Sequence, residues 1–319
     1  ELSLELSLRG PGALVSFEDA AVALGMTTEH AGRVWRALGF PDPLAVRTYL
    51  GLKDVEVLRL VAHDALQFLG PDSMMQFARV LGSAMVLLAE TIVDGFRVEY
   101  EVPQRDAGTR YLDIVRSYSE LAADLLPPFV EAMDSILRRQ IVAAARNMWA
   151  VDESRTTVTR QVTVGFVDLV GYTASTRALS PSALSDAVAR FENQVSEVVS
   201  SAGGRVVKLI GDEAMFVIDD RTGCDLALRL ADQTAADGGA GAVRIGLASG
   251  PAVTMGGDYY GDVVNLAARL VKAAEPGCVV VSASVRAAVE SGFLFTPLQP
   301  LQLKGFDEPV AAFVLTRDH

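Results

Sequence analysis

Two apolar segments separated by a tight turn place the strongest limit on how this chain folds. The first segment is RVVKLI (205–210), the second is AMFVI (214–218), and Gly211, Asp212 and Glu213 alone lie between them. A parallel crossover needs about a dozen residues or more, so the two strands must pair as an antiparallel hairpin. This part of the chain therefore predicts an α+β domain with a mixed or antiparallel sheet.

The two halves of the chain differ in their hydrophobic period. In the second half, strand patterns at 161–170, 243–250 and 278–285 alternate with helix patterns at 181–201, 221–235 and 263–274. The first half opens on a short strand-like alternation at 1–9. It then carries helix patterns at 16–25, 27–39, 54–68, 72–94, 109–125 and 127–149, with Gly70-Pro71 and Pro127-Pro128 as breaks. For the first two helices, Ser16 and either Thr27 or Thr28 are the expected N-caps, and Gly25 and Gly39 the expected ends. We predict an all-helical domain over 1–150, a linker over 151–160 and a second domain over 161–319.

Charge and residue usage exclude several classes of protein. The net charge is −12 and both halves are acidic, so neither has the basic surface that drives non-specific nucleic-acid binding. Two distant cysteines exclude a Cys-rich zinc site. From residue 151 onward the first histidine is His319, which excludes histidine-based hydrolysis and His-ligated zinc. The apolar run at 80–89 is shorter than the ~20 residues of a spanning helix, so we expect a cytoplasmic protein.

Two aspartates stand at strand ends in the second half. Asp168 ends the strand VTVGFVD, and Asp212 lies in the turn of the hairpin. If these strands are neighbours, both carboxylates reach one end of the sheet. Such a pair suits Mg²⁺ or Mn²⁺, which are completed by substrate phosphates. The alternative is that Asp168 caps the next turn, while Asp212 and Glu213 are solvated turn residues.

A helix further along the chain carries two more polar candidates. Asn265 and Arg269 are four residues apart and share one face of an otherwise apolar helix. We expect both to find partners, because unpaired buried polar groups are costly. An internal Arg–carboxylate pair is one interpretation. The other is a guanidinium directed at a transferring phosphoryl group, with the asparagine orienting a sugar.

Four segments, FVDLVGYT, VVKLIGDEAMF, VRIGLASGPAV and GDYYGDVVNLAARL, together resemble the catalytic domain of class III nucleotidyl cyclases, and LKGFDEPVAAFVL resembles its bacterial ending. The resemblance covers roughly 160–315. It implies a ferredoxin-like βαββαβ core that works as a head-to-tail homodimer with shared active sites. The implied reaction is attack of the ribose 3′-hydroxyl of ATP on the α-phosphate, giving cyclic AMP and pyrophosphate, assisted by two divalent cations per site.

The resemblance also assigns a role to each candidate residue. Asp168 and Asp212 would hold the two metal ions, Mg²⁺ or Mn²⁺. Lys208 and Asp258 would read the base. A lysine donor and an aspartate acceptor complement the edge of adenine, whereas guanine reverses that edge, so this pair favours ATP.

The remaining assignments concern the sugar and the phosphates. Asn265 would orient the ribose, and Arg269 would stabilise charge on the pentavalent phosphorus. Arg244 and Lys304 are candidates for binding the β- and γ-phosphates. All these residue types are present, which argues against a nucleotide-binding pseudocyclase. The GDE turn lacks the doubled glycine of diguanylate cyclases.

The helical first half also resembles the regulatory module of soluble mycobacterial-type cyclases, and we expect it to control activity. The alternative is that its helices only hold the dimer together. Its helix pair at 16–39 resembles a helix-turn-helix, so a DNA-binding regulator is an alternative. Against that alternative, the second helix offers only Arg33 and Arg36, and no basic arm follows. Helices that are apolar on several faces, as at 74–93, leave a bound lipophilic ligand open as a further alternative.

Overall fold

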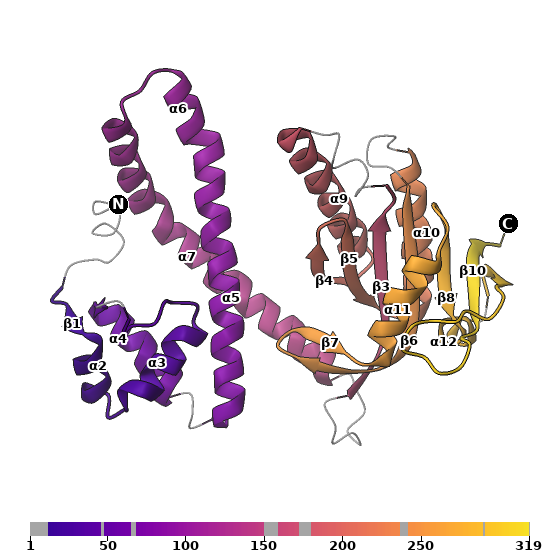
Figure 1. The fold of residues 1–319 in the computed structure, drawn as a ribbon, viewed down its shortest axis with the longest axis horizontal. Helices are drawn as coiled ribbons and strands as arrows, with labels where there is room; N and C mark the ends of the chain where they lie inside the picture. The colour runs from indigo at the N-terminus through magenta and orange to yellow at the C-terminus, as the bar shows by residue number, and fades with distance from the viewer. Residues whose placement is uncertain are drawn as a thin grey trace. The chain divides into compact units, whose positions relative to one another are not determined.

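The computed structural model describes residues 12–45, 48–64, 68–149, 159–171, 180–236, 242–289 and 291–318. The chain forms two compact units, Glu1–Arg155 and Thr156–His319 (Figure 1). The strand pattern predicted at 1–9 lies outside the described residues, and so does the predicted linker except for its last two positions.

The first unit is helical apart from one two-residue strand pair. Its elements are β1 (Val15–Ser16), α2 (Phe17–Ala23), α3 (Thr28–Ala37), β2 (Tyr49–Leu50), α4 (Leu52–Arg59), the π-helical η1 (Leu60–Asp64), α5 (Pro71–Phe96), the π-helical η3 (Arg97–Glu101), α6 (Val102–Asp106) and α7 (Tyr111–Trp149). Strands β1 and β2 pair antiparallel. A core around Phe17, Trp35 and Leu58 packs α2, α3 and α4 against the start of α5.

Helices α2 and α3 begin at the predicted N-cap residues, and α2 ends just before the predicted glycine. The hydroxyl of Ser16 accepts the N–H of Asp19 at 3.1 Å, and that of Thr27 accepts the N–H of His30 at 3.2 Å. Each side chain thereby satisfies a backbone donor that the first helical turn leaves unpaired. Gly25, with φ 68°, follows the end of α2 in the left-handed conformation that favours glycine.

The break predicted at Pro127-Pro128 is wrong. Helix α7 runs from Tyr111 to Trp149 with both prolines inside it. A proline in a helix removes one backbone hydrogen bond and crowds the carbonyl four residues earlier. Here the cost is confined to two positions of a 39-residue helix, whose flanks are rich in Leu, Ala, Met and Glu, which favour helix.

The second unit is an α+β domain with a mixed sheet, which confirms the predicted fold class. Its elements are β3 (Thr159–Leu169), α9 (Pro181–Ser201), β4 (Arg205–Ile210), β5 (Glu213–Ile218), α10 (Asp220–Ala236), β6 (Val243–Met255), β7 (Asp258–Tyr260), α11 (Asp262–Ala273), β8 (Val279–Ser282), α12 (Ala283–Ala288), β9 (Phe293–Pro297) and β10 (Ala312–Arg317). The sheet order is β4-β5-β3-β6-β8-β10-β9, with β7 paired to β6. The elements β3-α9-β4-β5-α10-β6 form the ferredoxin-like core, in which β3 runs antiparallel to β5 and β6.

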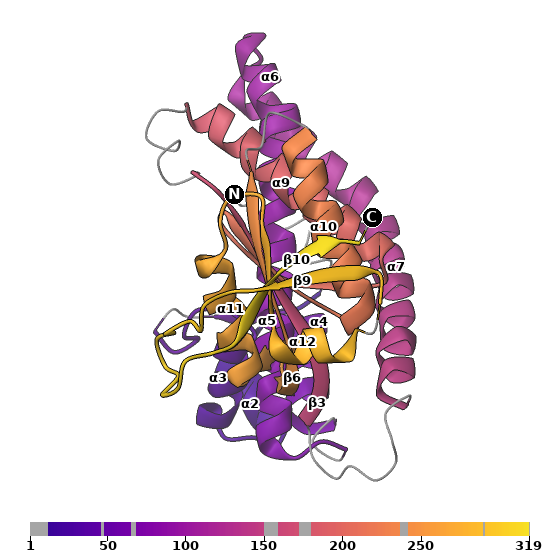
Figure 2. The same ribbon diagram turned by 90° about the vertical axis from the view of Figure 1, so that its right-hand side faces the viewer.

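The two faces of this sheet are covered by different helices. Val167 and Leu169 belong to the core with α9, α10 and α12, whereas Val164 and Phe166 belong to the core with α11. The alternation follows from the period of two along a strand. Figure 2 shows α11 on one side of the strands and α10 and α12 on the other.

A glycine sets how closely α11 approaches the sheet. A Cβ atom at Gly246 of β6 would lie 2.3 Å from the backbone nitrogen of Val271 and 2.6 Å from the carbonyl oxygen of Ala267. The backbone of α11 therefore rests directly on β6. This contact fixes where the polar residues of α11 stand relative to the ends of β3 and β5.

Candidate active site

Asp168 lies one residue before the end of β3, on the face of the sheet that α11 covers. Strand alternation places it on the same side as Phe166. Its partners in the sheet register are Glu213 of β5 and Arg244 of β6. The residue is 3% exposed. A carboxylate this buried needs cationic or hydrogen-bonding partners.

Two cations provide those partners. Arg244 donates from Nε to Oδ2 of Asp168 at 2.5 Å. Lys272, on α11, donates from Nζ to Oδ1 of Asp168 at 3.1 Å and to Oε2 of Glu213 at 2.5 Å. The end of the sheet thus holds a network of two carboxylates and two cations, drawn from β3, β5, β6 and α11.

The pKa of Lys272 reflects this position. Partial burial of the ammonium lowers its pKa, but hydrogen bonds to Glu213 and Asp168 more than offset that effect, and the pKa is raised. Lys272 therefore keeps its charge in the neutral range. Lys272 was not among the residues predicted from the sequence, whereas Glu213 was expected to be a turn residue or a structural partner, which agrees with its ion pair. The sequence could have suggested Lys272, because it lies three residues after Arg269 on the same helix and therefore near the same face.

Asp212 lies in the turn between β4 and β5, next to the end of β3. Its carbonyl oxygen accepts the N–H of Leu169, the residue after Asp168, at 2.9 Å. The expectation that the hairpin brings Asp212 to the same sheet end as Asp168 agrees with this backbone contact.

The described residues contain no group of three His, Cys, Asp or Glu side chains that could hold a metal. Two aspartates provide hard oxygen donors of the kind that Mg²⁺ and Mn²⁺ prefer, so these residues fit such an ion.

Lys208 and Asp258 come from different strands and meet. Nζ of Lys208 on β4 lies 2.6 Å from Oδ2 of Asp258, at the start of β7. The other carboxylate oxygen, Oδ1, accepts the N–H of Tyr259 at 2.8 Å. Arg205 strengthens the link between these strands, because it donates to the carbonyl of Gly257 at 3.0 Å and lies over the ring of Tyr259. The pair is partly exposed, with its Lys208 side chain 39% accessible.

Asn265 and Arg269 are both exposed on one face of α11. Neither side chain has a hydrogen-bond or ion-pair partner among the described residues, so of the two interpretations the internal Arg–carboxylate pair is not formed. The reason is geometric, since Val263, Ala267 and Leu270 face the sheet and turn the polar pair outward.

Lys304 stands apart from the other candidates. It is exposed, in a turn with Gly305, within the loop that joins β9 to β10. In the part of the chain that the structure describes, no hydrogen bond or ion pair links it to Asp168, Lys208 or Arg269. The structure places Arg244 in the ion pair with Asp168.

Comparison with known proteins identifies the family. Residues 155–317 match the model of the adenylate and guanylate cyclase catalytic domain. The chain belongs to this family. The predicted class III cyclase resemblance is confirmed, and the chain is an enzyme of the cyclase class.

Relatives extend the similarity to the helical half. An uncharacterised protein of Mycobacterium tuberculosis is 35% identical over 93% of this chain and 78% of its own length. An adenylate cyclase of Streptomyces coelicolor is 34% identical over 86% of this chain and 73% of its own. A pH-sensitive adenylate cyclase of Mycobacterium tuberculosis is 29% identical over 96% and 79%. Among solved structures, the adenylyl cyclase CyaB from P. aeruginosa is 24% identical over 50% of this chain and 97% of its own, with a TM-score of 0.43.

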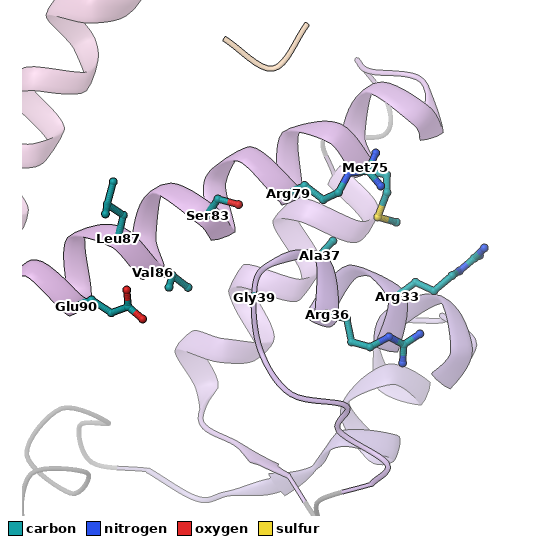
Figure 3. Close-up of a pocket in the computed structure, with 10 residues that line it drawn as sticks. All are labelled: Arg33, Arg36, Ala37, Gly39, Met75, Arg79, Ser83, Val86, Leu87 and Glu90. Atoms are coloured by element: carbon teal, nitrogen blue, oxygen red, sulfur yellow. The ribbon is translucent and has the colours of Figure 1, made fainter. Parts of the chain in front are cut away.

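The helical unit contains a pocket of its own (Figure 3). This open pocket of about 850 Å³ lies between α3 and α5. Arginines from both helices and apolar residues of α5 line it together: Arg33, Arg36, Arg79, Met75, Val86 and Leu87. Its apolar residues are compatible with the lipophilic ligand that the sequence left open as an alternative. That alternative stays a prediction.

One helical stretch of the described residues is long and apolar enough to cross a membrane. It runs over Pro71–Asp106, and 11% of its most apolar window is buried. It was not predicted from the sequence, because charged residues interrupt it and its longest uncharged apolar run, 80–89, is short. Core and interface helices pass the same test, so one such stretch is weak evidence for a membrane span.

Proposed function

We propose that this protein is an adenylyl cyclase that converts ATP to cyclic AMP and pyrophosphate. The observation that carries the proposal is the pairing of Lys208 with Asp258. A lysine donor and a carboxylate acceptor held 2.6 Å apart present the two complementary groups that the amino and N1 edge of adenine requires. Guanine offers the reverse pattern, and a site built from polar groups discriminates strongly against a base that leaves them unpaired.

Asp168 and Asp212 would hold two divalent cations, Mg²⁺ or Mn²⁺. Cations at such a site supply charge neutralisation for the triphosphate and lower the pKa of the attacking hydroxyl. The chain's own residues do the rest. Asn265 orients the ribose, and Arg269 stabilises the charge that develops on the transferring phosphoryl group. Arg244 and Lys304 bind the outer phosphates.

The complete site requires two copies of the chain. Asp168 and Asp212 would serve one site of a homodimer, while Lys208, Asp258 and the α11 residues serve the other. Support comes from the exposure of Asn265 and Arg269, which have no partner among the described residues of their own chain. We further propose a cytoplasmic enzyme whose helical unit, 1–150, followed by the linker 151–160, regulates the catalytic domain, 161–319.

The test is product formation by the full-length protein. ATP and GTP would be incubated in parallel with Mn²⁺ and the products separated by chromatography, with Asp212→Ala as the control. We expect cyclic AMP from ATP, little product from GTP, and loss of activity in the variant. Equal turnover of both nucleotides would contradict the assignment of the base-reading pair. Nucleotide binding without turnover would favour a pseudocyclase.

A further inference from the structure

We infer that Lys272 is an internal counter-ion of Asp168, and that the Lys272 ammonium and a divalent cation are alternative partners of that carboxylate. This inference rests on the proposed function, because it takes Asp168 as a metal ligand. It assigns a positioning role to Lys272, a residue that the proposed chemistry does not otherwise use.

Both oxygens of Asp168 are engaged by cationic side chains. Arg244 takes Oδ2 at 2.5 Å and Lys272 takes Oδ1 at 3.1 Å. A divalent cation on either oxygen would lie within a few ångströms of a fixed positive charge. Repulsion at such distances in a partly buried site is large, so one of the two side chains must give way.

Lys272 is the side chain that can leave. Arg244 is held by its place in β6, directly opposite Asp168 in the sheet register, and its side chain is 31% exposed. Lys272 reaches the carboxylate from α11 with a flexible stem, and its side chain is 47% exposed. Moving the lysine ammonium back into water costs little free energy, because an ammonium is strongly hydrated and its stem is flexible, whereas a guanidinium is more weakly hydrated.

Glu213 gives Lys272 a second anchor. The ammonium lies 2.5 Å from Oε2 of Glu213, closer than to Asp168. Lys272 can therefore release Asp168 and remain paired with Glu213. The displacement is small and leaves no buried charge without a partner, because Asp168 then gains the cation.

The experiment measures metal binding without nucleotide. The full-length protein would be titrated with Mn²⁺, and free Mn²⁺ would be followed by electron paramagnetic resonance. Lys272→Met removes the competing charge, and Lys272→Arg keeps it. Arg317→Met is the matched control, since Arg317 also pairs with an aspartate, Asp232, on the same unit. Asp168→Asn reports on the site itself.

We expect Lys272→Met to bind Mn²⁺ about fivefold more tightly than the wild type, the size of a lost ion pair. Lys272→Arg and Arg317→Met should stay close to the wild-type dissociation constant. Mn²⁺ should also raise the melting temperature of Lys272→Met more than that of the wild type, because in that variant the cation replaces a missing partner of Asp168.

Two results would overturn the inference. One leaves the proposed function intact, and the other overturns its metal step as well. If Asp168→Asn loses Mn²⁺ binding while Lys272→Met binds as the wild type does, only the role of Lys272 is wrong. If Asp168→Asn binds Mn²⁺ as well as the wild type, Asp168 is not a metal ligand. In that case the inference and the metal step of the proposed function fail together.

Discussion

The buried carboxylate of Asp168 shows how single residues serve stability and chemistry together. At 3% exposure its charge would be costly without partners, and removing one partner of a buried pair is strongly destabilising. Arg244 and Lys272 provide those partners. Any substitution at Asp168 therefore changes stability as well as the metal binding proposed for it. The exposed residues of α11 are better places to separate the two effects.

Arg269 offers the clearest test of a single side chain. It is exposed and without an ion-pair partner in the described chain, so Arg269→Ala should leave the melting temperature unchanged. Loss of a group that stabilises transition-state charge should lower kcat by about 10²–10³-fold. Steady-state kinetics with ATP and a thermal scan check both expectations. Arg221→Ala, at an exposed arginine on α10, is the control, and near-normal turnover by Arg269→Ala would refute the role.

Lys208 determines base preference in the proposed site. Lys208→Met leaves Asp258 with its bond from the N–H of Tyr259 but removes the donor to the base. We expect kcat/KM for ATP to fall by at least about tenfold, because an unpaired polar edge is left in the complex. The ratio of ATP to GTP turnover should fall with it. An unchanged ratio would mean that the pair does not contact the base.

At the level of elements, sequence reasoning succeeded where the signal was local. The caps at Ser16 and Thr27 and the hairpin around Gly211 depend on neighbouring residues, and all were predicted. The two-proline break failed because a long helix absorbs a local cost. The ion pair between Lys272 and Asp168 joins residues 104 apart in the chain, so its detection required the sheet register and the packing of α11.

The contact between α11 and β6 leads to a prediction about an element. Gly246→Val places a branched side chain where even a Cβ lies 2.3 Å from the backbone of α11. We expect a loss of unfolding free energy of about 1–3 kcal/mol or more. Activity should fall too, since Arg269 and Lys272 move with the helix. Chemical denaturation measures the first effect.

Gly95→Ala in α5 provides the comparison for that variant. An added Cβ at Gly95 meets nothing within 4 Å, and alanine favours a helix over glycine. The stability of Gly95→Ala should equal or exceed that of the wild type. Equal stability of Gly246→Val and the wild type would show that α11 does not rest on β6 as described.

On the scale of the whole molecule, the long helices of the first unit expose more apolar surface than the folded chain alone explains. The exposed side chains on α5 and α7 include Phe77, Leu87, Ile92, Val93, Leu125, Val130, Ile136, Leu137 and Ile141. Extended apolar surface of this kind marks an interaction site. We propose that the helical units of two chains cover this surface in a homodimer, which would let the first domain control the assembly of the catalytic sites.

Complementation between two inactive variants tests whether each active site combines residues of two chains. Asp212→Ala would remove a proposed metal ligand in the hairpin turn, and Arg269→Ala would remove the arginine proposed to face the phosphate. If the site is shared, a dimer of the two variants has one site with both residues intact. We would co-express the variants with different tags, purify the mixed dimer and measure cyclic AMP formation from ATP.

The account predicts that each variant alone is nearly inactive and that the doubly tagged dimer recovers about half of the wild-type activity, from one intact site of two. Mixed dimers as inactive as the single variants would contradict it. They would mean that Asp212 and Arg269 serve the same site from the same chain, or that they are not part of the site at all.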